Sequence, residues 1–176
     1  MAGDWAVLHS RKLYEGRILN LRLDEVRLPS GRLAVREIVE HRPAVAMLPV
    51  ADDGSVLLIR QYRDAIRQEI LEIPAGILNP GESPREAARR ELQEEIGFDA
   101  KHLEEWGTFF TSPGFSDEQV TLFCASGLVE SRLDPDEDEF IRILAVPREE
   151  IPVLLDSGRI RDAKTLAALA WYLAKK

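Results

Sequence analysis

One stretch of 23 residues, GILNPGESPREAARRELQEEIGF, constrains this chain more than any other feature. Its fixed spacing runs from a glycine through five residues to a glutamate, and then through seven residues to Arg-Glu, two more glutamates and a closing glycine. If each identity occurred at roughly 7%, all seven would coincide by chance with a probability of order 10⁻⁸ per starting position. The residues are Gly76, Glu82, Arg90, Glu91, Glu94, Glu95 and Gly97. The pattern predicts a glycine-bearing loop and then a helix that carries several carboxylates.

The predicted helix has well-defined ends. Ser83, Pro84 and Glu86 form a start signal, with Ser as the N-cap, Pro at the first helical position and Glu placed for a capping box. Gly97 supplies the stop, because glycine readily enters the left-handed conformation that ends a helix. Apolar residues at helical spacing mark the buried side: Ala87, Ala88, Leu92 and Ile96.

The carboxylates of this helix gather on one face. Glu91 and Glu95 are four residues apart and therefore neighbours, and Glu94 lies at the edge of the same face. Like charges at this spacing destabilise a helix by a few tenths of a kcal/mol, and a bound divalent cation would remove that cost. Oxygen ligands of this kind suit Mg²⁺-type cations and the phosphates that they bind. A solvated acidic helix, paired with its own arginines, is the alternative interpretation.

These residues resemble the signature box of the Nudix hydrolases, which cleave nucleoside diphosphates linked to another group and use Mg²⁺ or Mn²⁺. The likeness narrows to the ADP-ribose pyrophosphatase branch through Pro113, sixteen residues beyond Gly97. Three flanking segments also look like that branch: 59–63, 71–76 and 112–118. The resemblance runs from about Arg36 to Ile143. It implies an α/β (α+β) fold of the Nudix type, an α/β/α sandwich with a mixed sheet.

The pattern along the rest of the chain favours the same fold class, because strands alternate with and precede helices. Strands are expected at 17–28, 32–40, 44–50, 56–62, 101–110, 119–126 and 140–146, and further helices at 147–155 and 162–175. Residues 69–73 lead into the 23-residue motif. The first two strands form an N-terminal antiparallel hairpin around Pro29-Ser30-Gly31. Alternation in residues 17–28 is imperfect, which admits a bulge there.

We expect residues 1–42 to form this N-terminal β-hairpin region and residues 43–176 to form the Nudix hydrolase domain. A hairpin is marginally stable by itself. Packing against a second subunit would stabilise it, and a symmetric dimer is the commonest such arrangement. The resemblance also implies a homodimer, with N-terminal strands that contribute to the substrate pocket of the partner.

Composition excludes several classes of protein. A net charge of −8 argues against a general nucleic-acid-binding surface, which would be basic. No apolar run approaches eighteen residues, so no membrane span is expected. The single cysteine excludes an internal disulfide, and the first residues lack a secretion signal, so a cytoplasmic location is expected. Metal ions and local arginines would have to reverse the negative potential around an anionic substrate.

The resemblance assigns metal-binding roles by position. Glu91, Glu95 and the backbone carbonyl of Ala75 match the principal ligands, and Gly76 would let that backbone approach the ion. Glu82 and Glu94 rank below them as direct or water-mediated ligands. Arg90 is expected to orient a ligand carboxylate. The expected cofactor is Mg²⁺, with Mn²⁺ or Zn²⁺ as substitutes.

The general base and the substrate contacts are less constrained. Residues 134–139 hold five acids in six positions, usually the mark of a solvated loop. The resemblance instead supports a catalytic loop in which Glu137 or Glu139 is the base or completes the metal shell, with Glu137 slightly preferred. Arg63 and Arg36 are candidate substrate contacts, as is Glu118 near the ribose or a metal-bound water. An ordinary surface arginine is the alternative interpretation for both, and for Arg36 it weighs as much as substrate contact.

The resulting hypothesis is hydrolysis of ADP-ribose to AMP and ribose 5-phosphate, by attack of water on one phosphorus. Other nucleoside diphosphate sugars, such as GDP- or UDP-sugars, are alternative substrates, because one sequence does not define pocket shape. A non-catalytic ADP-ribose sensor and a purely structural acidic domain are the other classes. The presence of both Glu91 and Glu95 favours an enzyme over a sensor.

Overall fold

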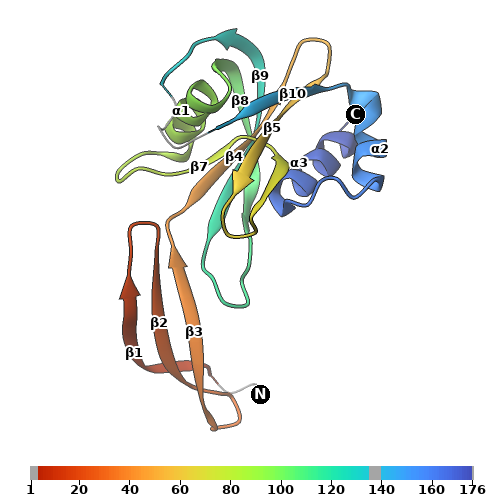
Figure 1. Cartoon of the computed structure of the whole chain (residues 1–176). Coiled ribbons are helices and arrows are strands. Elements are labelled where there is room, and N and C mark those ends of the chain that lie inside the picture. Colours follow the sequence, from red (N-terminus) through yellow and green to blue (C-terminus); the bar gives the residue numbers. More distant parts are fainter. Residues whose placement is uncertain (1–3, 135–139, 176) are drawn as a thin grey trace. The chain divides into compact units, whose positions relative to one another are not determined.

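The computed structural model describes residues 4–134 and 140–175. The chain forms two compact units (Figure 1). The first contains the residues up to Pro43 together with Phe110–Gln119, and the second contains Ala44–Phe109 and the residues from Val120 onward. The expected domain boundary after residue 42 stays a prediction, and the inclusion of Phe110–Gln119 in the first unit was not expected. No described helix is long and apolar enough to cross a bilayer.

The first unit is built on a three-stranded antiparallel sheet in the order β1-β2-β3. Its strands are β1 (Ala6–Glu15), β2 (Leu19–Arg27) and β3 (Leu33–His41). The predicted hairpin is β2–β3, and Gly31 takes the positive φ of 82° that its turn requires. The structure adds β1, which we did not predict. The irregular pairing lies between β1 and β2, where register shifts follow Val7 and Lys12, whereas β2 and β3 pair without a shift.

The second unit contains a seven-stranded mixed sheet. Its strands are β4 (Ala44–Val50), β5 (Val56–Arg63), β6 (Gln68–Glu72), β7 (Ala75–Ile77), β8 (Phe98–Phe110), β9 (Gln119–Glu130) and β10 (Arg142–Val146). The order is β10-β5-β4-β9-β8, with β6 paired to β5 and β7 paired to β4. The pairing of β4 with β9 is parallel and that of β4 with β7 is antiparallel, which makes the sheet mixed.

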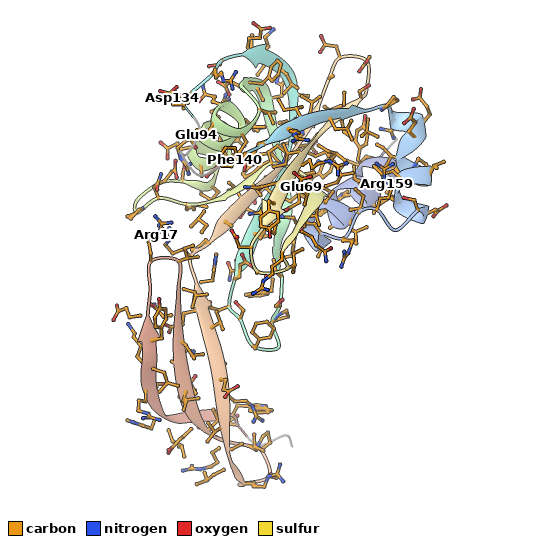
Figure 2. The ribbon with its side chains drawn as sticks, in the orientation of Figure 1. Arg17, Glu69, Glu94, Asp134, Phe140 and Arg159 are labelled. Atoms are coloured by element: carbon orange, nitrogen blue, oxygen red, sulfur yellow. The ribbon has the colours of Figure 1, made fainter. Side chains whose placement is uncertain are left out.

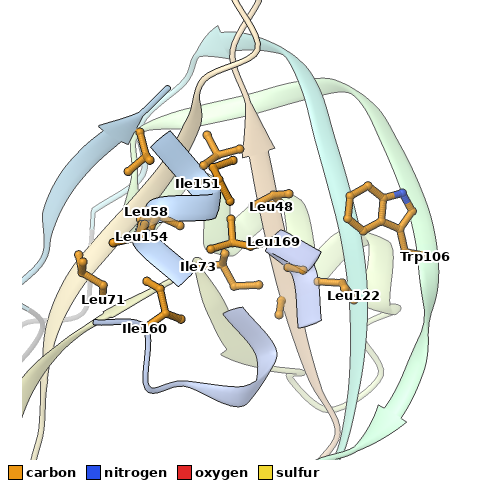
Figure 3. Packing of buried hydrophobic residues seen from close by; sticks show 14 of the residues in the cluster. Leu48, Leu58, Leu71, Ile73, Trp106, Leu122, Ile151, Leu154, Ile160 and Leu169 are labelled. Atoms are coloured by element: carbon orange, nitrogen blue, oxygen red, sulfur yellow. The ribbon is translucent and has the colours of Figure 1, made fainter. Parts of the chain in front are cut away.

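Helices cover both faces of this sheet, as the predicted sandwich requires. They are α1 (Pro84–Glu95), α2 (Ile151–Asp156), which follows a 3₁₀ turn at Arg148–Glu150, and α3 (Ala163–Ala174). Alternate residues of β4 face opposite sides and join two cores, so the strand reads as a continuous apolar run. One core packs against α2 and α3 (Figure 3) and the other against α1. The α/β (α+β) class is therefore confirmed.

Candidate active site

Helix α1 begins and ends where the sequence predicts. Ser83 is the N-cap and forms both hydrogen bonds of a capping box with Glu86. The helix is capped at its C-terminal end by Ile96, and Gly97 follows with a φ of 74°. Its buried face includes Ala87, Ala88 and Leu92, but also the carboxylates of Glu91 and Glu95, which are only 8% and 6% exposed. Buried carboxylates need partners, because burial without compensation is costly.

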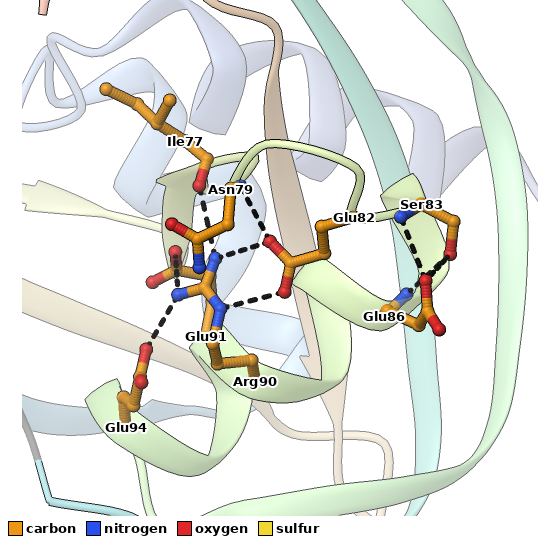
Figure 4. Close-up of polar contacts among 8 residues, drawn as sticks. All are labelled: Ile77, Asn79, Glu82, Ser83, Glu86, Arg90, Glu91 and Glu94. Atoms are coloured by element: carbon orange, nitrogen blue, oxygen red, sulfur yellow. Dashed lines mark hydrogen bonds and ion pairs between the residues drawn. The ribbon is translucent and has the colours of Figure 1, made fainter.

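Arg90 gathers three carboxylates of the motif around one guanidinium group (Figure 4). Its Nε and Nη2 donate to the two oxygens of Glu82 at 2.9 and 3.0 Å. Its Nη1 donates to Glu91 at 2.6 Å and to Glu94 at 2.8 Å. Nη2 also donates to the carbonyl of Ile77 at 3.1 Å, which ties the loop before the helix to the same group. The planar fork of arginine suits such multiple contacts.

This arrangement shifts two ionisation equilibria. The hydrogen bonds that Arg90 donates to Glu82 are the main reason that the pKa of Glu82 lies below its ordinary value, and the backbone N–H of Asn79 contributes at 2.8 Å. The same contacts with Glu82, together with the charge of Glu91, raise the pKa of Arg90. Glu82 and Arg90 therefore stay ionised together.

The loop that precedes α1 approaches the helix at Gly76 and Ala75. A Cβ atom at Gly76 would lie 1.9 Å from Cδ and Oε1 of Glu91, so only glycine lets this carboxylate pass so close to the backbone. The backbone N–H of Ala75 donates to Glu95 Oε2 at 3.0 Å. Strand β7 holds this loop against β4 through the pairs Ala46–Ala75 and Val45–Gly76. Two buried carboxylates thus converge on one short backbone segment.

The donor set fits a hard divalent cation in its chemistry. Glu91 and Glu95 supply carboxylate oxygens beside a loop backbone, and Mg²⁺ prefers oxygen ligands of this kind. No three His, Cys, Asp or Glu side chains within residues 4–134 and 140–175 already form a metal-binding group. The cation at the centre of Glu82, Glu91 and Glu94 is instead the guanidinium of Arg90.

A hollow of about 340 Å³ lies beside the C-terminal half of α1. Glu94 and Glu95 line it from the helix, and Arg132 adds a positive charge. Figure 2 labels three of the lining residues, Glu69, Glu94 and Phe140. The other lining residues are Glu69, Phe140, Ile141 and Arg142. Arg132 is held near α1 because its neighbours bond to the helix end: Ser131 N donates to the Gly97 carbonyl, and Leu133 N donates to the Gln93 carbonyl.

Arg63 lies at the end of β5 and pairs with the carboxylate of Glu72. Its Nε and Nη2 donate to the two Glu72 oxygens at 2.7 and 2.9 Å. Glu72 also accepts a hydrogen bond from Lys164 of α3. Burial raises the pKa of Glu72, but hydrogen bonds from Arg63 and the charge of Lys164 outweigh it and lower the pKa overall. The second unit therefore brings Arg63 into a buried ion-pair network that we did not predict.

Arg36 and Glu118 lie in the first unit. Arg36 is exposed on β3, and its Nη1 donates to the carbonyl of Val35 at 3.0 Å. Glu118 accepts a hydrogen bond from Thr111, and its Oε1 lies 3.5 Å from Nδ1 of His41. These two candidates therefore belong to a different unit from the α1 carboxylates.

Glu137 and Glu139 lie outside the described residues.

Among the residues predicted for the site, the structure brings together Glu82, Arg90, Glu91, Glu94, Glu95 and the Ala75 backbone. Sequence reasoning missed Glu72, Lys164 and Arg132. Glu72 lies in the segment 71–76, and the likeness of this segment to the family could have marked Glu72 as a candidate site residue. Lys164 and Arg132 carry no local pattern that marks them.

Comparison with known proteins matches the chain to two family models. The model described as NUDIX domain matches residues 40–169, and the one described as Nucleoside diphosphate sugar hydrolase N-terminal domain matches residues 5–39. The first model covers the whole α1 site. The second covers the three strands β1 to β3 almost completely.

Similar individual proteins span nearly the full chain. The ADP-ribose pyrophosphatase of Bacillus subtilis (strain 168) is 41% identical over 167 residues, which cover 94% of this chain and 90% of that protein. The methanol dehydrogenase activator of Bacillus methanolicus is 38% identical, with 93% and 90% covered. A crystal structure of an ADP compounds hydrolase superposes with a TM-score of 0.89 at 26% identity, over 99% of this chain and 95% of that one.

Proposed function

This chain belongs to the NUDIX domain family, and on that premise we propose that it hydrolyses the diphosphate of ADP-ribose to AMP and ribose 5-phosphate. The observation that carries the proposal is the convergence of two buried carboxylates, Glu91 and Glu95, on the backbone of Ala75 and Gly76. The likeness to an ADP-ribose pyrophosphatase over nearly the whole chain supports the choice of substrate. Water attacks one phosphorus, and the P–O bond of the diphosphate bridge breaks.

The proposed cofactor is Mg²⁺, with Mn²⁺ or Zn²⁺ as substitutes. Glu91, Glu95 and the carbonyl of Ala75 would hold it, and Glu82 ranks below them. When bound, the ion would neutralise phosphate charge and lower the pKa of a coordinated water. Arg90 holds the carboxylates of Glu82, Glu91 and Glu94 in place and does not itself need to touch the substrate.

The remaining roles are proposals that follow from position in the sequence. Glu137 is the proposed general base, with Glu139 as the alternative or as the residue that completes the metal shell, and Glu94 assists as a further carboxylate at the site. Arg63 binds the diphosphate, Arg36 contacts the nucleotide, and Glu118 lies near the ribose. The positive charges of Arg63 and Arg36 oppose the overall charge of −8, which would otherwise repel an anionic substrate.

Other nucleoside diphosphate sugars are a second substrate class. The match of residues 5–39 to the N-terminal domain of nucleoside diphosphate sugar hydrolases favours this broader class. GDP- and UDP-sugars contain the same diphosphate group, so the same carboxylates would serve. Selection among bases and sugars depends on contacts away from the reacting phosphorus.

We also propose that the protein works as a homodimer in the cytoplasm. The sheet of the first unit exposes large apolar side chains on its strands, among them Val7, Tyr14, Leu33 and Val35. Exposed apolar surface of this kind marks a protein–protein contact. A second copy of the chain is the simplest partner, because most soluble oligomers are symmetric homo-oligomers.

The test is a substrate panel assayed with Mg²⁺: ADP-ribose, a GDP-sugar and a UDP-sugar, each with the wild type and with Glu95→Gln. We expect ADP-ribose to be the best substrate and E95Q to lose at least about a hundredfold in kcat while it keeps its thermal stability. Fast turnover of another sugar nucleotide without turnover of ADP-ribose would overturn the choice of substrate. Wild-type activity of E95Q would show that Glu95 is not part of the active site.

A further inference from the structure

Four residues of alternating charge connect the N-terminus of α3 to the end of β5. Arg63 donates to both oxygens of Glu72, and Lys164 donates to Glu72 Oε2. Lys164 Nζ also donates to Asp162 Oδ1 at 2.9 Å. The order is therefore cation, anion, cation, anion, from Arg63 through Glu72 and Lys164 to Asp162.

The members of this network differ in burial, and Arg63 is the most exposed. The side chain of Glu72 is 1% exposed, and those of Lys164 and Asp162 are 14% and 15% exposed. The side chain of Arg63 is 38% exposed, so solvent and ligands reach the network mainly there. Charges in such surroundings must be paired, which explains why each inner member has a partner on either side.

The negative end of the network is compensated by a helix. Asp162 is the N-cap of α3, where it accepts hydrogen bonds from Thr165 N at 2.9 Å and Thr165 Oγ1 at 2.5 Å. A helix N-terminus carries a partial positive charge that stabilises an anion. Because α3 compensates Asp162, and Glu72 is shared between two cations, the positive charge of Arg63 is only partly neutralised.

The guanidinium of Arg63 is also fixed in orientation. The bidentate contact with Glu72 occupies Nε and Nη2, and Nη1 donates no hydrogen bond within the described part of the chain. A planar fork held along one edge presents its remaining donors in one direction. Burial lowers the pKa of Arg63, but its hydrogen bonds with Glu72 and the charges of Glu72, Glu95 and Asp162 raise it overall, so Arg63 stays cationic.

The same turn of α3 supports the loop that carries Ala75. The hydroxyl of Thr165 accepts a hydrogen bond from Ile73 N at 2.9 Å, and Thr165 is fully buried. Two residues further on, Ala75 N donates to Glu95. The N-terminus of α3 thus contacts both the partner of Arg63 and the segment leading to the α1 carboxylates.

We propose that Lys164 is a positioning residue, which shares Glu72 with Arg63 and thereby leaves Arg63 fixed and cationic for a phosphate oxygen of a diphosphate substrate near Glu95. This inference rests on the proposed function, since it assigns the substrate diphosphate to this side of the α1 carboxylates. A tether that only holds α3 in place is the competing explanation. The two differ in what removal of Asp162 does.

The experiment compares Lys164→Gln and Asp162→Asn. Asparagine remains a good N-cap, so D162N removes the terminal negative charge and keeps the helix start. Under our proposal K164Q weakens the binding of inorganic pyrophosphate with Mg²⁺, measured by calorimetry, by roughly five- to tenfold, whereas D162N leaves it unchanged or tighter. The KM for ADP-ribose follows the same order, with kcat within about twofold. Lys101→Gln on β8 is the matched control and changes neither quantity.

Parallel weakening by K164Q and D162N would support the tether and overturn the proposal, as would a K164Q variant with wild-type pyrophosphate affinity and KM. Thermal unfolding separates stability from affinity in each variant, and Lys164→Arg, which keeps the charge, is expected to recover most of the affinity. Pyrophosphate binding is read without turnover. If the wild type does not hydrolyse ADP-ribose, the proposed function fails, and the difference in pyrophosphate affinity between K164Q and D162N still reports on the anion site.

Discussion

At the scale of single residues, Arg90 organises the carboxylates of the motif. Its five donors contact Glu82, Glu91, Glu94 and the carbonyl of Ile77. Without a cation among them these carboxylates would repel one another. Arg90 therefore provides positive charge among these carboxylates, and a bound divalent ion would add to that charge.

Replacement of Arg90 by methionine tests this role. We expect Arg90→Met to lower the free energy of unfolding by about 1–3 kcal/mol, because it leaves partly buried carboxylates without their cation. Added Mg²⁺ should then raise the melting temperature of R90M more than that of the wild type. Scanning calorimetry with and without Mg²⁺ measures both effects. Equal Mg²⁺-induced shifts in the two proteins would show that the ion does not bind among these carboxylates.

Gly76 is the residue at which the backbone and a carboxylate come closest. We expect Gly76→Ala to displace Glu91, because its Cβ would occupy the position of that carboxylate, and to weaken Mn²⁺ binding by roughly 10- to 100-fold. Electron paramagnetic resonance measures the Mn²⁺ affinity. Glu91→Gln is the matched variant, and the double variant should lose little more than either single one. Additive losses would mean that Gly76 acts independently of Glu91.

The residues of the site differ in how far the sequence predicts them. Glu91 and Glu95 follow from helical spacing, and the start of the helix follows from Ser83 and Glu86, since these signals are local. Glu72 and Lys164 are 92 residues apart, so their contact depends on the tertiary fold. A local pattern does not encode a contact of that kind.

At the scale of elements, α1 is the helix whose ends are specified most completely by the sequence. We expect Ser83→Ala to lower stability by about 1 kcal/mol, because it removes the side-chain half of the capping box. The kcat for ADP-ribose should stay at the wild-type value, since the Ser83 hydroxyl forms its hydrogen bonds with Glu86 and with no carboxylate of the Arg90 cluster among the described residues. Urea denaturation and a steady-state assay measure the two quantities. A large fall in kcat at unchanged stability would contradict this separation of cap and site.

The contact between β6 and α3 should make stability depend on pH. The pKa of Glu72 lies below its ordinary value of 4.5 in the folded protein, so its ionised form stabilises the fold above that pH. This contribution is lost as the pH falls through the lower folded pKa. We therefore expect the wild type to be more stable than Glu72→Gln at about pH 6, and the gap to narrow toward about pH 3. Urea denaturation across this range measures the gap, and a constant gap would contradict the assignment.

Two elements show why sequence patterns are incomplete. Strand β1 is exposed along almost its whole length, so it lacks the alternation between buried and exposed residues that marks a strand. The expected helix at 147–155 starts as a 3₁₀ turn and becomes α-helical only at Ile151. Pro152 fits the first turn of a helix and not its interior, which accounts for the later start.

At the scale of the whole molecule, the exposed sheet of the first unit is the main sign of assembly. Val35 is 57% exposed on β3 and Leu33 is 64% exposed. We expect Val35→Asp to shift the protein from dimer to monomer, because a charge in a buried contact is costly, while the monomer keeps its fold. Light scattering coupled to size exclusion measures the mass, and circular dichroism checks the fold. A wild type that is already monomeric would contradict the proposed dimer.

The fold class follows from the sequence because the strands of the second unit are interrupted by one helix and followed by two more. The segment Phe110–Gln119 belongs to the first unit through contacts far along the chain, such as Val39 N with the Phe115 carbonyl and His41 N with Asp117 Oδ1. Contacts at that separation depend on the assembled structure. The sequence therefore predicts the architecture of the sheet more fully than it predicts which chain segments belong to each unit.

The most direct test is anomalous diffraction from crystals that contain Mn²⁺ and a non-hydrolysable ADP-ribose analogue. We expect an anomalous peak coordinated by carboxylate oxygens of Glu91 and Glu95, with the analogue's diphosphate oxygens in the same coordination sphere. Crystals that hold the analogue while both side chains remain without an ion would contradict it.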